Sequence, residues 1–105
     1  MKILFDQGTP APLRFELSAH QVSTAYEVGW SNLSNGDLLA AAENAGFELL
    51  ITTDQNLRYQ QNLKTRRIAI LVLLTTRWPR IKLHIPTVMN AVNSMSPGAY
   101  LELKL

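Results

Sequence analysis

The sequence has no cysteine, which excludes a disulfide framework and a thiolate metal site and is typical of a reducing cytoplasm. It also has no long apolar run. The longest, from Ile68 to Leu74, is far below the ~20 residues that a membrane-spanning helix needs. The first eight residues, MKILFDQG, contain one Lys and a short apolar run interrupted by Asp6, and they lack the pattern of a signal peptide. We therefore expect a cytoplasmic protein with no membrane partner.

Charge is also scarce in this chain. Only 17% of the residues are charged, and the net charge is +2. This balance permits a nucleic-acid partner without requiring one, because dedicated binders carry a denser basic stripe. With 105 residues, of which 47% are apolar, residues 1–105 are expected to form a single domain around one core.

What is present is a series of apolar segments that are typical of buried strands. Four are expected, at residues 2–5, 47–53, 67–74 and 99–105. The middle two are continuous rather than alternating, which indicates strands covered on both faces, as in a parallel sheet. The last alternates Leu with Glu and Lys, as an edge strand does. Residues 20–25 form a weaker fifth candidate.

Helical patterns lie between these strands. Residues 9–18 begin with prolines, residues 35–46 are rich in helix formers and end at Gly46, and residues 80–95 place apolar side chains on one face. Pro86 is expected to kink or restart the last helix. The alternation predicts an α/β fold, a three-layer α/β/α sandwich with a mostly parallel sheet of four to five strands. Ligands bind such sheets at the carboxyl ends of the strands.

Acidic residues follow two of the expected strands. Asp6 comes directly after the first strand and Asp54 after the strand at 47–53. Asp37 lies in the first turn of the helix that leads to that second strand, and this helix begins at the same edge of the sheet. Glu27, just past the weaker strand, is a fourth candidate. These carboxylates repel one another unless a cation offsets their charge, and Mg²⁺ is commonly bound by one or two carboxylates with water and phosphate oxygens. The pattern therefore favours metal-dependent phosphodiester hydrolysis.

Each acid also has an ordinary structural interpretation. Asp54 is suited to capping a helix, Asp37 forms a capping-box pattern with Ser34, and Asp6 is suited to an Asx-turn. Glu27 is suited to a solvated helix surface. Capping and coordination are compatible, because both need the carboxylate at the same edge.

The segments MKILFDQGTPAPLRFEL and AYEVGWSNLSNGDLLAAAENAGFELLITTDQNLRYQQNL resemble the small PIN-like family of bacterial nucleases, which are relatives of VapC-type toxins. The most specific part is an Asp that opens a helix, the alanine-rich helix itself, and a strand that ends in Thr-Thr-Asp. The resemblance covers nearly the whole chain up to the helix after Pro79.

The resemblance implies an RNA-cleaving enzyme that holds Mg²⁺ or Mn²⁺ through three or four acids. By position, the catalytic and metal-binding acids are Asp6, Asp37 and Asp54, and Glu27 is the loosest match. The resemblance also implies a toxin–antitoxin pair, with a small antitoxin as protein partner, and it allows a homodimer. This chain departs from the pattern in two places: it has Asn56 where many relatives have a second Asp, and Gly8 where many have Asn. Asn56 contributes no charge, so catalysis is expected to be weaker or absent.

The polar string after Asp54, residues 55–62, is expected to line a groove beside that acid. Arg58 is suited to a phosphate and Tyr59 to stacking on an unpaired base, with Asn56 beside them. Arg77, next to Trp78 and again at a strand end, is a further candidate for contact with RNA.

These residues also have structural alternatives. Tyr59 would then pack with only its hydroxyl at the surface, and Trp78 would seal the sheet edge. The cations Lys64, Arg66 and Arg67 add positive charge near the expected acidic site, or they simply precede a strand.

Three functions are therefore compatible with the sequence. The first is a metal-dependent endoribonuclease that acts on RNA. The second is a catalytically weak or inactive module of the same fold that acts through a protein partner or by binding RNA. The third, a phosphoacceptor receiver domain, is disfavoured because Asp6 has no second acid beside it.

Overall fold

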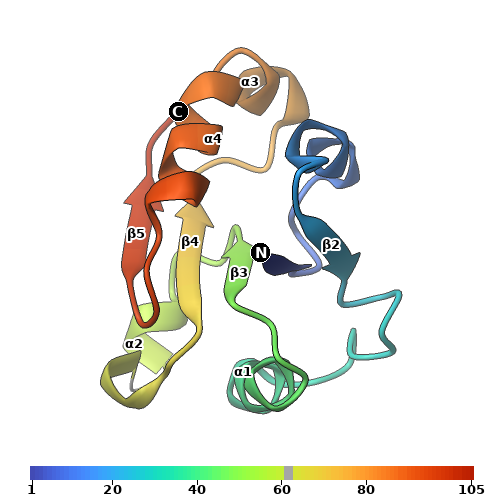
Figure 1. The fold of residues 1–105 in the computed structure, drawn as a ribbon, viewed down its shortest axis with the longest axis vertical. Coiled ribbons are helices and arrows are strands. Elements are labelled where there is room, and N and C mark those ends of the chain that lie inside the picture. The colour runs from blue at the N-terminus through green and yellow to red at the C-terminus, as the bar shows by residue number, and fades with distance from the viewer. Residues whose placement is uncertain (61–62) are drawn as a thin grey trace.

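The computed structural model describes residues 1–60 and 63–105 and contains a five-stranded sheet (Figure 1). The strands are β1 (Lys2–Phe5), β2 (Gln21–Thr24), β3 (Leu49–Thr52), β4 (Ala69–Leu73) and β5 (Tyr100–Leu103). They lie in the order β2-β1-β3-β4-β5, and every neighbouring pair is parallel. The weaker strand candidate at residues 20–25 is confirmed as β2, and the alternating C-terminal segment is confirmed as the edge strand β5.

Side chains alternate between the two faces of the sheet and form two buried clusters. On β3, Leu49 and Ile51 belong to one cluster and Leu50 to the other. Every residue of β3 and β4 is buried, as the continuous apolar runs predict for central strands.

Helices cover both faces, which gives three layers. The first face is covered by the 3₁₀ helix η1 (Ala11–Leu17) and by α3 (Trp78–Lys82) and α4 (Ile85–Ser94). The second face is covered by α1 (Asn35–Asn44) and the short α2 (Leu57–Gln60), and a 3₁₀ turn, η2 (Leu63–Thr65), precedes β4. In Figure 1, α3 and α4 lie at the upper end of the view and α1 lies at the lower end.

Two of the expected helices differ in detail from the prediction. Residues 9–18 were expected to form an ordinary helix but contain the 3₁₀ helix η1, whose segment begins with a Leu13 N–H bond to the Pro10 carbonyl, three residues back. The segment at 80–95 is divided into α3 and α4, with Pro86 in the first turn of α4. Pro86 therefore restarts the helix, since a proline in the first turn needs no N–H donor.

The strand order places a topological switch point between β1 and β3. The chain leaves β1 toward β2 on one side, and β3 lies on the other side of β1. Ligands bind doubly wound sheets at the carboxyl ends of the strands that flank such a point. Several doubly wound folds share this order, so it establishes the three-layer class without selecting a family. Across the described residues, no helix combines the length and apolar character needed to cross a membrane.

Candidate functional site

Asp6 and Asp54 are joined through one buried hydroxyl at the carboxyl ends of β1 and β3. Thr52, whose exposed fraction is 1%, donates from Oγ1 to Oδ2 of Asp6 at 2.8 Å. The same Oγ1 accepts the backbone N–H of Asp54 at 3.1 Å. The backbone N–H of Asp6 also bonds to the Ile51 carbonyl at 2.9 Å, which fixes β1 against β3 at this point. The expectation that these two acids meet at one sheet edge is therefore confirmed.

Asp54 also connects this edge to the start of α1. Its Oδ2 accepts a hydrogen bond from Nδ2 of Asn35, the first residue of α1, at 2.9 Å. Its Oδ1 accepts the backbone N–H of Asn56 at 2.9 Å, which forms an Asx-turn ahead of α2. The carboxylate thus forms a turn ahead of α2 rather than capping that helix as generic preference suggests, and it also contacts α1.

Asp37 lies in the first turn of α1, whose N-cap is Ser34. The hydroxyl of Ser34 accepts the backbone N–H of Asp37 at 3.4 Å, so the capping interpretation is confirmed for Ser34. The Asp37 side chain is exposed, and within residues 1–60 and 63–105 its carboxylate has no hydrogen bond or ion pair. A negative charge is favourable there, because it faces the positive end of the helix dipole.

Glu27 is held by groups of its own neighbourhood. Its Oε1 lies 2.7 Å from Nη2 of Arg14, and Oε2 lies 3.2 Å from Nη1. Glu27 and Thr24 also exchange bonds, because each backbone N–H donates to the other's side-chain oxygen. The Arg14 hydrogen bond, followed by the Thr24 N–H, lowers the pKa of Glu27 to about 2. This carboxylate therefore stays ionised and pairs with Arg14.

The four candidate acids are better suited to a metal site with one or two carboxylate ligands than to a site with four. In the part of the chain that is described, no three His, Cys, Asp or Glu side chains gather into a group that could hold a metal ion. Asp6 and Asp54 nonetheless lie at one edge with hard oxygen donors, and one or two carboxylates completed by water form a usual Mg²⁺ environment. The donor chemistry at this edge therefore suits Mg²⁺ or Mn²⁺.

The loops after β1 and β3 lie close together at this edge of the sheet. A side-chain carbon added at Gly8, in the loop after β1, would collide with the hydroxyl of Thr53 after β3. In the same loop, the buried Thr9 donates from its hydroxyl to the Ile51 carbonyl at 2.8 Å. Gly8 has room for a larger residue only if Thr53 moves.

The candidate substrate-binding residues Asn56, Arg58 and Tyr59 follow Asp54 and are exposed. The interpretation that Tyr59 packs in the structure is wrong: its exposed fraction is 72%, and the Arg58 guanidinium lies 4.7 Å from the centre of its ring. Arg58 also lies 3.5 Å from a carboxylate oxygen of Glu102 on β5. Gln61 and Asn62, the end of the predicted groove lining, lie outside the described residues.

Arg77 lies at the N-cap of α3 and is exposed. It borders a groove of about 470 Å³ together with Pro79, Arg80 and Leu83. The neighbouring Trp78 is partly buried and packs against the core, which agrees with its expected packing role.

The cations before β4 lie at the opposite edge of the sheet from Asp6 and Asp54. Arg66 pairs with Glu43 near the end of α1 at 2.9 Å, and the Arg67 N–H donates to the same carboxylate at 2.7 Å. The expectation that Arg66 and Arg67 add positive charge near the acidic site is therefore wrong.

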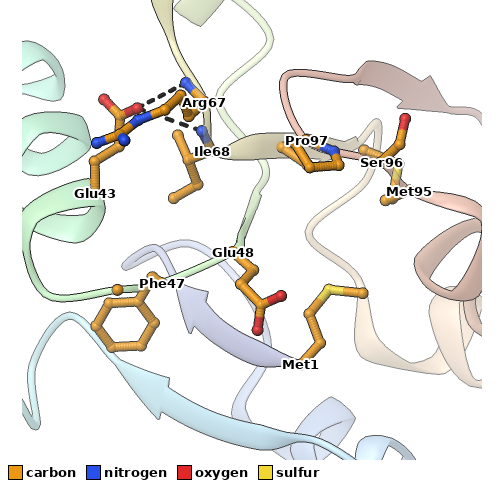
Figure 2. Close-up of a pocket in the computed structure, with 11 residues that line it drawn as sticks. Met1, Glu43, Phe47, Glu48, Arg67, Ile68, Met95, Ser96 and Pro97 are labelled. Atoms are coloured by element: carbon orange, nitrogen blue, oxygen red, sulfur yellow. Dashed lines mark hydrogen bonds between the residues drawn. The ribbon is translucent and has the colours of Figure 1, made fainter.

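A hollow of about 370 Å³ lies at the amino ends of the strands, away from the two acids. Figure 2 shows its lining, with Glu43 and Arg67 on one side and Met95 and Pro97 on another. Doubly wound sheets bind ligands at the other edge, so the acidic network is the stronger candidate for the functional site.

Charge is divided sharply along the chain. Residues 1–54 contain seven acids and two cations, whereas residues 55–101 contain seven cations and no acid. The boundary falls just after Asp54, so the acidic network belongs to the negative part and α2, α3 and β4 to the positive part. An uneven distribution of this kind suits an anionic partner.

Sequence reasoning did not identify Thr52 and Asn35 as parts of this network. A polar residue within an otherwise aliphatic buried strand is the signal that points to Thr52, because a buried hydroxyl needs a partner. Asn35 has a weaker signal, its place directly after the N-cap Ser34.

Comparison with protein-family models, with curated proteins and with solved structures finds no match to this chain.

Proposed function

We propose that this chain is a PIN-like, metal-dependent endoribonuclease whose central acids are Asp6 and Asp54. The observation that carries the proposal is that Thr52 bonds both to the Asp6 carboxylate and to the backbone N–H of Asp54, at the switch point of a parallel sheet. The ordered sequence resemblance supports the same assignment. A toxin role with an antitoxin partner rests on that resemblance alone.

Asp6 and Asp54 would hold Mg²⁺ or Mn²⁺, and Asp37 would contribute from the first turn of α1. When bound, such an ion lowers the pKa of a water ligand and stabilises negative charge on a transferring phosphoryl group. Thr52 orients the Asp6 carboxylate, and Asn35 holds Asp54 against α1. Glu27 is the least supported of the four acids, because Arg14 already neutralises it.

Arg58 and Tyr59, which follow Asp54 along the chain, would contact RNA beside these acids. Arg58 follows Asp54 within one turn, and the exposed ring of Tyr59 offers a stacking surface for an unpaired base. Asn56 lies between Asp54 and Arg58 in the sequence, and its backbone N–H donates to the Asp54 carboxylate. This arrangement favours single-stranded RNA, whose bases are free to stack.

Cleavage of a labelled single-stranded RNA in the presence of Mn²⁺ tests the proposal. Asp6→Asn and Asp54→Asn should each slow cleavage by about a hundredfold or more, the loss that follows removal of a group that stabilises transition-state charge. Glu16→Gln is the matched control, because Glu16 is an exposed acid on η1 outside the network. Wild-type cleavage rates in either Asp variant, purified in parallel and shown by circular dichroism to be folded, would contradict the assignment.

A second candidate is a catalytically weak module of the same fold that acts by binding RNA or a protein partner. It is favoured by the absence, within the described residues, of a group of three acids suited to a metal, and by Asn56 in place of an acid. The two candidates differ in the same assay: the module would bind the RNA without cutting it, and the Asp variants would bind as well as the wild type.

A further inference from the structure

The groove beside α3 combines exposed apolar side chains with positive charge. Its lining consists of Arg77, Pro79, Arg80 and Leu83. Leu83 has an exposed fraction of 79%, although α3 and α4 on either side of it are anchored in the core by Ile81 and Val88. A single exposed leucine is ordinary on a protein surface. Leu83, however, lines the same groove as two arginines, so the groove offers a partner an apolar contact next to positive charge.

Among the described residues, no acidic side chain forms an ion pair with the arginines of this groove. The three ion pairs of the described residues use Arg14, Arg58 and Arg66, and none involves a cation of α3. The nearest acid along the chain, Glu102, is bonded to Arg58 and to the hydroxyl of Tyr100.

The two arginines differ in how firmly they are placed. Nε of Arg80 donates to the carbonyl of Leu105 at 2.8 Å, which holds this guanidinium at the groove. Arg77 is at the N-cap of α3, and its backbone N–H bonds to the hydroxyl of Thr75. The guanidinium of Arg80 is therefore held in place, whereas at Arg77 it is the backbone that is fixed, and both residues are exposed. Arginine is enriched at protein interfaces.

We propose that this groove binds an acidic peptide segment of a partner protein. A large apolar side chain of the segment would lie between Pro79 and Leu83, and its carboxylates would pair with Arg77 and Arg80. RNA fits the groove less well, because bases stack on exposed aromatic rings and the neighbouring Trp78 is packed against the core. The proposal goes beyond the nuclease assignment and does not depend on catalysis.

Fluorescence anisotropy with defined probes tests the proposal on the full chain. The probe is a fluorescein-labelled peptide that repeats two glutamates and one leucine. The comparison peptides replace leucine by glycine or glutamate by lysine, and a labelled oligouridylate represents RNA. The wild type should bind the glutamate–leucine peptide at least about fivefold more tightly than any of the other three, because both anchors contribute.

Two variants and a control locate the binding. Leu83→Ser and the double variant Arg77→Ala/Arg80→Ala should each weaken binding of the glutamate–leucine peptide by about fivefold or more. Arg67→Ala is the matched control, because Arg67 is an exposed arginine at the opposite edge of the sheet, and it should bind as the wild type does. Leu83 is exposed, so its variant is expected to fold even if the loss of the Arg80 bond to Leu105 disturbs the double variant.

Equal binding of the leucine and glycine peptides, or wild-type binding by Leu83→Ser, would overturn the proposal because no apolar anchor would exist. Preferred binding of the oligouridylate would also overturn it and would make the groove an RNA surface. Absence of binding of the glutamate–leucine peptide to the wild type would also overturn the proposal. None of these results bears on RNA cleavage, which is measured separately with the Asp6 and Asp54 variants.

Discussion

At the scale of single residues, the site depends on one threonine hydroxyl that both donates and accepts. Thr52 donates to Asp6 and accepts from the backbone N–H of Asp54, so it sets the position of one acid and the backbone of the other. A valine in its place has nearly the same shape but can do neither. Thr9, in the loop after β1, provides a comparison, because its buried hydroxyl bonds to the Ile51 carbonyl and, among the described residues, to no acid.

Thr52→Val should therefore weaken Mn²⁺ binding by about tenfold, the usual effect of losing a group that orients a metal ligand. It should also lower the free energy of unfolding by about 1–3 kcal/mol, because a partly buried N–H loses its acceptor. Metal titration and thermal unfolding measure the two effects.

Thr9→Val is the matched control for this change. It should cost stability on a similar scale and leave Mn²⁺ binding as in the wild type, because its hydroxyl does not touch an acid. Equal loss of metal affinity in both variants would mean that Thr52 acts only through general packing.

At the scale of elements, the positions of the strands and the burial of the central ones could be predicted from the sequence. Side-chain contacts between the segments that connect the strands could not. β3 and β4 are buried on both faces, so each is encoded by a continuous apolar run. Such a run can be recognised from the residues of that strand alone. From parallel strands it follows that Asp6 and Asp54 share an edge. The Glu27–Arg14 pair was not predictable, because it joins the turn after β2 to η1 through surface side chains whose meeting depends on how both segments pack.

This pair predicts a pH dependence of stability. The pKa of Glu27 lies at about 2 in the fold against an ordinary value of 4.5, so its stabilising effect is complete above about pH 4.5 and is lost as the pH falls toward 2. Glu27→Gln should thus lower the melting temperature at pH 5 and have little effect near pH 2. The difference at pH 5 should be small, because the pair is exposed to solvent.

Melting curves from circular dichroism between pH 2 and pH 6 measure this dependence. Glu16→Gln is the control, since Glu16 is an exposed acid of η1, and it should follow the wild type more closely. A constant offset between wild type and Glu27→Gln over the whole range would show that the Arg14 pair does not stabilise the fold through its charge.

At the scale of the whole molecule, acids and cations are divided along the chain, and the division falls just after Asp54 at the carboxyl end of β3. Residues 1–54 supply Asp6, Asp37 and Asp54, and residues 55–101 supply cations without any acid. A bound cation would reduce the repulsion between the acids and an RNA backbone that the positive part attracts. The account therefore depends on whether the acidic edge binds a divalent cation at all.

Isothermal titration of Mn²⁺ tests this most directly, with the wild type, Asp6→Asn/Asp54→Asn and the control Glu16→Gln compared under one set of conditions. We expect the wild type and the control to bind Mn²⁺ alike and the double variant, folded by circular dichroism, to show no binding. Absence of binding by the wild type, or undiminished binding by the double variant, would contradict the metal site and leave Asp6 and Asp54 as residues that shape the turns after β1 and β3.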